Sequence, residues 1–371
     1  MKMDKKIYIT QPFLPPLEEF NIYLQQIWKS KHITNNGPFH KLFEQELCSY
    51  LGVKYISLLT NGTIALLVAI KALELKGEVI TTPYSFVATA HSIRWNGLEP
   101  VFVDIEPVYC NLNTDKIESA ITVKTSAIIS VHVYGNPCET IRIKNIAEKH
   151  NLKVIYDAAH AFGVDQNGKS ILNEGDLSIL SFHATKVFNT FEGGAIISHT
   201  AEMKQKIDDL INFGFQNETT VKGLGINGKM NEVQSAMGLL QLKYIDKVIE
   251  KRKNIAYLYK NGLEKTQGIS FLDDLDEVNH NYAYFPIFVH KDEYGLTRDE
   301  LYQKLMQNNI FGRRYFYPLI SQFDEYNKIA SASRNNLPIS EKISKEVICI
   351  PIYPDLELEI IEKIRKVIAT P

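Results

Sequence analysis

The segment Lys153-Val-Ile-Tyr-Asp-Ala-Ala-His160 places a short apolar run directly before an acidic side chain. Such a run, rich in β-branched residues, is typical of a parallel strand that is covered on both faces. Similar runs in the same part of the chain predict strands at residues 55–60, 78–81, 100–104, 127–133, 177–182 and 195–198. Amphipathic stretches such as 63–75 and 139–150 lie between them. This alternation predicts an α/β fold around a mostly parallel sheet.

The chain of 371 residues is long enough for about two domains. We expect a large α/β domain at residues 1–250 and a smaller α+β domain at residues 251–371. Apolar residues at helical spacing predict one long helix over 231–250 that leaves the large domain. Beyond it the rhythm weakens, with strands expected at 282–289 and 347–352 and helices at 297–308 and 356–369.

The composition excludes several classes of function. Lys plus Arg number 41 and Asp plus Glu number 43, so no charge excess favours nucleic acid or an anionic membrane as partner. The four cysteines show no spacing typical of a metal site, and we interpret them as reduced thiols. Prolines interrupt the stretch after the N-terminal lysines, and no run of 18 apolar residues follows. We therefore expect a cytoplasmic protein without a metal site or a membrane span.

Side chains that could bind a ligand or take part in catalysis follow three of the predicted strands. They lie at residues 60–63, 157–160 and 181–186. Ligands of an open parallel sheet bind beyond the carboxyl ends of its strands, so these segments are expected to meet at one edge.

Asn61-Gly62-Thr63 follows a strand and opens a helix. Free N–H groups and the helix dipole would favour a phosphate there, although an ordinary N-cap explains the same residues. The segment matches neither the dinucleotide fingerprint nor the P-loop, which counts against NAD and ATP.

Asp157 ends a buried strand, where an unpaired carboxylate is costly. A protonated pyridine nitrogen would be a suitable partner, and this pairing would keep the pyridine ring an electron sink. A structural Asp that caps the following turn is the alternative. His160 could bind a ligand oxygen or could be a structural histidine.

Lys186 follows the strand at 177–182 and precedes Gly193-Gly194. A lysine in a desolvated site has a lowered pKa, attacks a carbonyl as the free amine and serves as a general base. The alternative is a surface lysine whose stem covers apolar neighbours.

Taken together, and in this order, these motifs resemble the sugar aminotransferases of the DegT/DnrJ/EryC1/StrS family, which are fold type I enzymes dependent on pyridoxal phosphate. The resemblance extends from residues 33–38 into the C-terminal part. The motifs that carry it are Asn61-Gly62-Thr63, Pro83-Tyr-Ser-Phe-Val-Ala-Thr89, Asp157-Ala-Ala-His160, Ser181-Phe-His-Ala-Thr-Lys186 and Gly225-Ile-Asn-Gly-Lys-Met-Asn-Glu-Val-Gln234.

The resemblance implies a role for each matching position. Lys186 would hold pyridoxal phosphate as a Schiff base, Asp157 would pair with the pyridine nitrogen, and His160 would lie near the phenolic oxygen. Phe86 would stack on the ring. The cofactor phosphate would be bound by Gly62, Thr63, Ser181 and, from the partner subunit, Asn227, so the resemblance also implies a homodimer. Where many relatives carry Arg two residues after that Asn, this chain has Lys229, which cannot form a bidentate fork.

Two stretches resemble the branch that makes 4-amino-4,6-dideoxy sugars on dTDP: Phe188-Asn-Thr-Phe-Glu-Gly-Gly194 and Pro12-Phe-Leu-Pro-Pro-Leu-Glu-Glu-Phe20. The implied acceptor is dTDP-4-keto-6-deoxyglucose. The implied donor is glutamate, which leaves as 2-oxoglutarate, with pyridoxamine phosphate between the two half-reactions. The product would be dTDP-4-amino-4,6-dideoxyglucose, a precursor suited to O-antigen biosynthesis. Candidates for nucleotide binding are Arg313, Arg314, Tyr315 and Tyr317, with a solvated loop as the alternative.

Other functions remain open at this point. The enzyme could act at another sugar carbon, or on a UDP or GDP sugar. The related sugar dehydratases carry His in place of the Schiff-base lysine, so Lys186 argues against that reaction. A non-catalytic sensor and a binding protein without cofactor are the alternatives from other classes.

Overall fold

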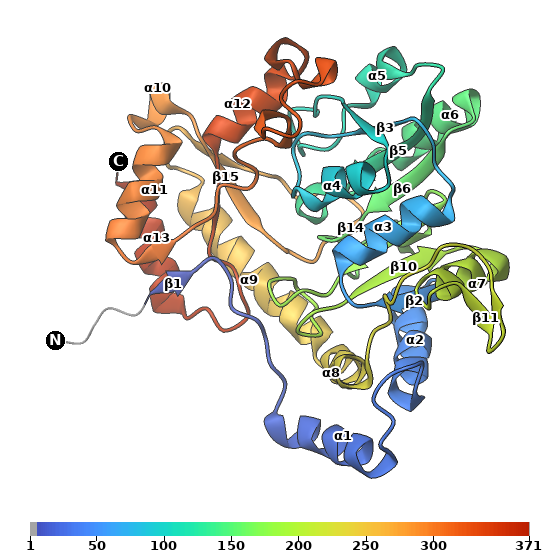
Figure 1. The fold of residues 1–371 in the computed structure, drawn as a ribbon. Coiled ribbons are helices and arrows are strands. Elements are labelled where there is room, and N and C mark those ends of the chain that lie inside the picture. The colour runs from blue at the N-terminus through green and yellow to red at the C-terminus, as the bar shows by residue number, and fades with distance from the viewer. Residues whose placement is uncertain (1–5, 371) are drawn as a thin grey trace.

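A seven-stranded sheet forms the centre of the larger part of the protein (Figure 1). The computed structural model describes residues 6–370. The strand order is β2-β10-β9-β6-β5-β3-β4, and only the two pairs that involve β10 are antiparallel. The strands are β2 Tyr55–Leu59, β3 Glu78–Thr81, β4 Glu99–Phe102, β5 Thr125–Val131, β6 Lys153–Asp157, β9 Leu177–Ser181 and β10 Gly194–Ser198. The predicted α/β fold with a mostly parallel, mixed sheet is confirmed.

Helices cover both faces of this sheet. Helix α3, Gly62–Ala72, contacts β9 and β10 on one face, where Ile179 and Ile196 pack against it. Helices α2, Pro38–Leu51, and α8, Glu232–Leu242, pack together in the core on the opposite face, against Leu58 and Leu180. Neighbouring strand residues thus point into different cores, as expected for a sheet buried on both sides. The other helices of this part are α1 Leu17–Ser30, α4 Ala88–Trp95, α5 Thr114–Ile117, α6 Thr140–His150 and α7 Ala201–Leu210.

The single helix predicted over 231–250 is wrong, because the structure has two helices there. Asn231 is the N-cap of α8, and its side chain accepts a hydrogen bond from the backbone amide of Gln234. Helix α9 then runs over Ile245–Leu263. Between them Tyr244 has φ −117°, and its hydroxyl bonds Glu19 in α1. The apolar spacing continues through this turn, so periodicity alone could not reveal the break.

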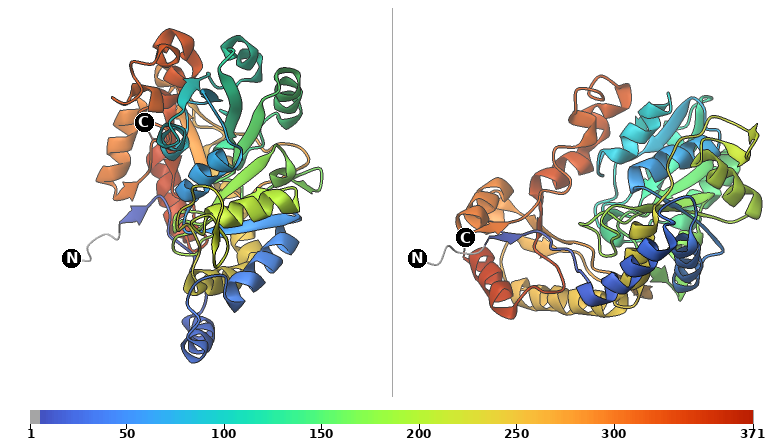
Figure 2. Two further views of the ribbon diagram at one scale, coloured as in Figure 1. Left: turned by 45° about the vertical axis from the view of Figure 1, so that its right-hand side comes forward. Right: turned by 60° about the horizontal axis from the view of Figure 1, so that its bottom comes forward.

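The smaller part surrounds an antiparallel sheet of β13 Ile269–Phe271, β15 Phe285–Val289 and β17 Val347–Ile350. Helices α9, α11 Arg298–Gln307 and α13 Leu358–Ala369 pack beside it, and α12 covers Pro338–Glu346. Helix α9 runs from the larger part into this one (Figure 2). Strand β1, Ile7–Tyr8, pairs with β16, Ile310–Phe311, so the first described residues join the C-terminal part. We retain a domain boundary near residue 250 as a proposal, with this strand assigned to the smaller domain.

Residues 6–370 contain no helix long and apolar enough to cross a membrane. Over the same residues, no cluster of three or more His, Cys, Asp or Glu side chains has metal-binding geometry. The four cysteines are free thiols.

Candidate active site

A cavity of about 520 Å³ opens at the carboxyl ends of the central strands. This volume lies in the range of small-molecule sites, about 300–1,000 Å³. Seven of the predicted cofactor residues line it, although they come from four separate segments: Gly62, Thr63, Phe86, Asp157, His160, Ser181 and Lys186. Phe86 is 60 % exposed, so its ring is available to stack on a planar ligand.

The N-terminus of α3 forms one end of the cavity. Asn61 caps the helix, because its side-chain oxygen accepts a hydrogen bond of 2.8 Å from the Ile64 amide. Gly62 packs so closely on Ser181 that a Cβ atom would lie 2.8 Å from the Ser181 Cβ. The N-cap considered from the sequence is therefore present, and the same helix end lines a cavity, which leaves phosphate binding there as a prediction.

Asp157 carries a buried carboxylate beside this cavity and is 5 % exposed. Its Oδ2 accepts a hydrogen bond of 2.8 Å from Thr89 Oγ1, and its Oδ1 accepts one of 3.1 Å from the Ala159 amide. Burial raises the pKa of the carboxyl, which these hydrogen bonds and Lys186 counteract. No Lys, Arg or His side chain within residues 6–370 forms an ion pair with it. A cationic ligand group would therefore supply what this site lacks.

His160 lies on the wall of the same cavity and is 4 % exposed. Burial, with the nearby Lys186 charge, holds the pKa of this histidine well below its ordinary value, so the ring is neutral. Its Nδ1 accepts a hydrogen bond of 3.3 Å from the Tyr134 amide. The hydrogen of the neutral ring is therefore on Nε2, which can donate to a ligand oxygen.

Lys186 projects into the cavity from the loop after β9. Burial lowers the pKa of its amine, and Asp157 partly offsets that effect. The Nζ atom lies 3.3 Å from the hydroxyl of Tyr284. A lysine of this kind is suited to attack a carbonyl carbon as the free amine.

Of the remaining predicted residues, Tyr315 lines this cavity, whereas Asn227, Arg313, Arg314 and Tyr317 do not. Asn227 is exposed. The carbonyl of its neighbour Gly228 accepts a hydrogen bond from the Thr60 amide, just before the N-terminus of α3. Arg314 forms an ion pair of 2.9 Å with Asp299, and its guanidinium lies over the Tyr317 ring at 5.2 Å. Arg313 is exposed and has no ion pair within the described part of the chain.

From that stretch, the predicted Tyr315 and its neighbour Phe316 line the cavity. Two further residues of the site received no role from the sequence. Thr89 lies in a motif quoted above, but nothing in its spacing indicates a bond to Asp157. Tyr284 precedes a strand of the smaller part, and only the tertiary structure brings it to Lys186.

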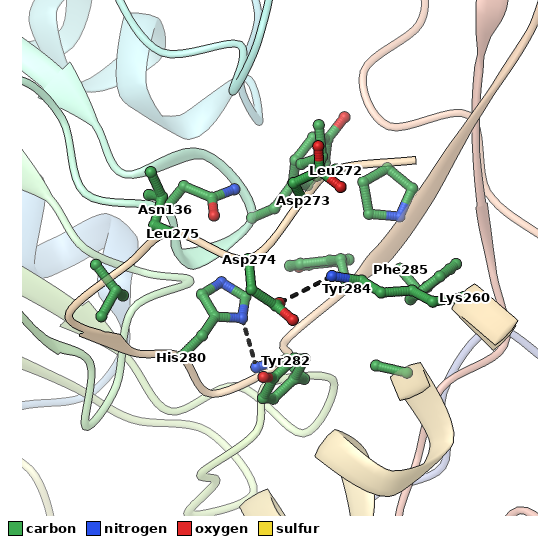
Figure 3. A pocket seen from close by; sticks show the side chains of 14 residues that line it. Asn136, Lys260, Leu272, Asp273, Asp274, Leu275, His280, Tyr282, Tyr284 and Phe285 are labelled. Carbon is green, nitrogen blue, oxygen red and sulfur yellow. Dashed lines mark hydrogen bonds and ion pairs between the residues drawn. The ribbon is translucent and has the colours of Figure 1, made fainter. Parts of the chain in front are cut away.

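The residues that line the cavity match the chemical groups of pyridoxal phosphate. It offers a helix N-terminus for the phosphate, an unpaired buried carboxylate for a protonated ring nitrogen, a histidine donor for a phenolic oxygen and an amine for the aldehyde. A neighbouring cavity, shown in Figure 3, shares Tyr284 but has a volume of only about 40 Å³. It contains the ion pair of 2.9 Å between Lys260 and Asp274. That space suits ordered water rather than a cofactor.

Comparison with known proteins agrees with this geometry. The profile of the DegT/DnrJ/EryC1/StrS aminotransferase family matches residues 17–369. A dTDP-4-amino-4,6-dideoxy-D-glucose transaminase of Shigella dysenteriae is 53% identical over 362 residues, 98% of each chain. A transaminase of the same name from Escherichia coli is also 53% identical, over 366 residues and 98% of each chain. The structure of DesI, solved in the presence of its TDP-sugar product, superposes with a TM-score of 0.94 at 30% identity and covers 99% of this chain and 93% of its own. The resemblance is thus confirmed, and the chain belongs to the DegT/DnrJ/EryC1/StrS aminotransferase family.

Proposed function

We propose that this aminotransferase uses pyridoxal phosphate to move an amino group from glutamate to C4 of dTDP-4-keto-6-deoxyglucose. The products are 2-oxoglutarate and dTDP-4-amino-4,6-dideoxyglucose. One observation carries the cofactor assignment: the Lys186 amine and the unpaired Asp157 carboxylate line one cavity beside the N-terminus of α3. The 53% identity to transaminases of that name supports the choice of sugar.

Lys186 has two tasks in this proposal. Its Nζ holds the cofactor aldehyde before the amino donor arrives, and the lowered pKa of the amine favours that attachment. Once released from the cofactor, Nζ would be placed to take the proton from Cα of glutamate and to return it within the same cavity. In the second half-reaction the same amine moves a proton in reverse, onto C4 of the sugar. The two products leave in separate steps, so the kinetics are expected to be ping-pong.

The other cavity residues position and tune the reaction. When bound, pyridoxal phosphate supplies an electron sink for the negative charge that develops at the reacting carbon. Asp157 keeps the ring nitrogen protonated, and the donor on His160 Nε2 orients the phenolic oxygen. Phe86 covers the ring, while Gly62, Thr63 and Ser181 bind the phosphate at the N-terminus of α3.

The active unit in this proposal is a homodimer in which Asn227 serves the partner's site. Asn227 is exposed and does not line its own cavity, and three large apolar side chains that precede it in the chain are also exposed, namely Phe213, Leu224 and Ile226. A mixture of Lys186→Ala and Asn227→Ala subunits tests the sharing. Each homodimer is impaired, whereas a mixed dimer contains one intact site. Regained turnover on mixing supports a shared site, and no gain despite demonstrated exchange of subunits contradicts it.

The substrate is tested directly with purified, cofactor-loaded protein. Incubation with glutamate and dTDP-4-keto-6-deoxyglucose is expected to yield the amino sugar nucleotide and 2-oxoglutarate in equal amounts. The corresponding UDP and GDP sugars serve as matched alternatives. Faster turnover of one of those would move the acceptor to another nucleotide, and no amino sugar from any of them would refute the proposed reaction.

A further inference from the structure

Tyr284 connects the smaller domain to the reacting amine. It directly precedes β15, and its hydroxyl lies 3.3 Å from Lys186 Nζ. Its ring meets the His160 ring edge to face, with centroids 4.8 Å apart. Tyr284 therefore touches two groups that the proposed reaction uses, although more than ninety residues separate it from Lys186 in the chain.

The hydroxyl of Tyr284 is suited to hold either form of the amine. Burial raises the pKa of this phenol above its ordinary value, so it keeps its hydrogen at neutral pH. A phenol both donates and accepts hydrogen bonds. It can donate to the lone pair of a neutral Lys186 amine and accept from the charged ammonium. Within residues 6–370, this hydroxyl forms a hydrogen bond with Lys186 and with no other residue.

The amine needs such a partner after it is displaced. A free lysine side chain has several rotatable bonds, and a base must stay aimed at the proton that it transfers. The other polar groups around Lys186 have different tasks, since Asp157 faces Thr89 and Ala159, and the His160 Nδ1 faces the Tyr134 amide. Tyr284 is the neighbour whose polar atom is directed at Nζ.

We propose that Tyr284 is a positioning residue that holds the displaced Lys186 amine in line for proton transfer; this rests on the function proposed above. Hydrogen bonds to a charged group are stronger than those between neutral groups, so the hydroxyl stabilises the ammonium more than the amine. Loss of the hydroxyl is therefore expected to make Lys186 easier to deprotonate while leaving it poorly aimed.

The matched experiment compares Tyr284→Phe with Tyr282→Phe. Tyr282 lies two residues away, lines the smaller cavity of Figure 3 and is absent from the wall of the larger one. In cofactor-free protein, the rate of reductive methylation of Lys186 is followed against pH by peptide mass spectrometry. The midpoint is expected to fall by about one pH unit in Tyr284→Phe and to stay unchanged in Tyr282→Phe.

A second readout uses the loaded enzyme, in which the glutamate half-reaction of Tyr284→Phe is expected to slow by about ten-fold. Tyr284→Met also lacks the hydroxyl and must shift the methylation midpoint in the same direction, which guards against a folding defect of one variant. An unchanged midpoint in both variants would overturn the inference, even if the wild-type enzyme makes the amino sugar. A shifted midpoint without turnover of any keto sugar would support the pairing and refute the proposed function instead.

Discussion

Thr89 Oγ1 donates a hydrogen bond of 2.8 Å to Asp157 Oδ2. Thr89 Oγ1 also lies 3.1 Å from Ser85 Oγ, so hydrogen bonds to Ser85 and Asp157 fix the position of the Thr89 hydroxyl. Because burial raises the pKa of Asp157, this bond helps to keep the carboxylate ionised in a site that disfavours charge.

Replacement of Thr89 by Val is expected to weaken the binding of pyridoxal phosphate by about ten-fold, since a hydrogen bond to a buried charge contributes about 1.5–3 kcal/mol and part of it is recovered by relaxation. Thr89→Ser keeps the hydroxyl and serves as the control. Cofactor affinity is measured by titration of the visible absorbance. Equal affinities of the Val and Ser variants would show that the bond has no role in cofactor binding.

His160 is expected to act as a neutral donor over the whole working range of pH. The pKa of this histidine lies well below its ordinary value, so no limb of the pH–rate profile between about pH 6 and 8 should belong to it. The His160→Gln variant retains a hydrogen-bond donor, so its turnover rate should stay within about ten-fold of the wild-type rate. The His160→Leu variant lacks the donor, and its turnover rate should fall by about a hundred-fold. A profile limb in this pH range that disappears in His160→Gln would contradict the neutral form.

Arg313 and Arg314 are expected to contribute differently to binding of the nucleotide sugar. Arg313 is exposed and unpaired within the described residues, so Arg313→Gln should raise the KM for the nucleotide sugar, with a smaller effect at high salt. Arg314 is held by Asp299, so Arg314→Gln should leave that KM unchanged and lower the free energy of unfolding by less than about 1 kcal/mol. Steady-state kinetics at two ionic strengths separate them, and equal effects on KM would contradict the distinction.

The buried histidine His40 predicts a dependence of stability on pH. Burial and the charge of Lys204 lower its pKa to about 4, below the value of about 6.5 in the unfolded chain. Below pH 6.5 the unfolded state therefore binds a proton that the native state does not, and the free energy of unfolding falls as the pH falls towards 4. Both ring nitrogens lack a hydrogen-bond partner within the described structure.

His40→Met removes this titration and should reduce the loss of stability between pH 7 and pH 5 by about 2 kcal/mol. Urea denaturation of the cofactor-free protein at both pH values measures the difference. An equal loss in wild type and variant would show that His40 is already protonated in the native state at pH 5.

The sequence predicted those strands and helices whose apolar pattern is set by residues close together in the chain. The seven strands are confirmed because buried parallel strands are continuous apolar runs, and their carboxyl ends brought Gly62, Asp157 and Lys186 to one cavity. The break at Tyr244 escaped prediction because the apolar spacing continues through the turn. Tyr284 escaped because its place beside Lys186 depends on a contact between residues far apart in the chain.

The assignment of Lys186 as the residue that holds the cofactor is the central claim. It is tested most directly by loading the protein with pyridoxal phosphate, reducing it with borohydride and mapping the modified peptide by mass spectrometry. The account predicts that the phosphopyridoxyl group is on Lys186, and that Lys186→Ala leaves a folded protein without that modification. Attachment at another lysine, such as Lys229, or a protein that remains unmodified after loading, would contradict the account.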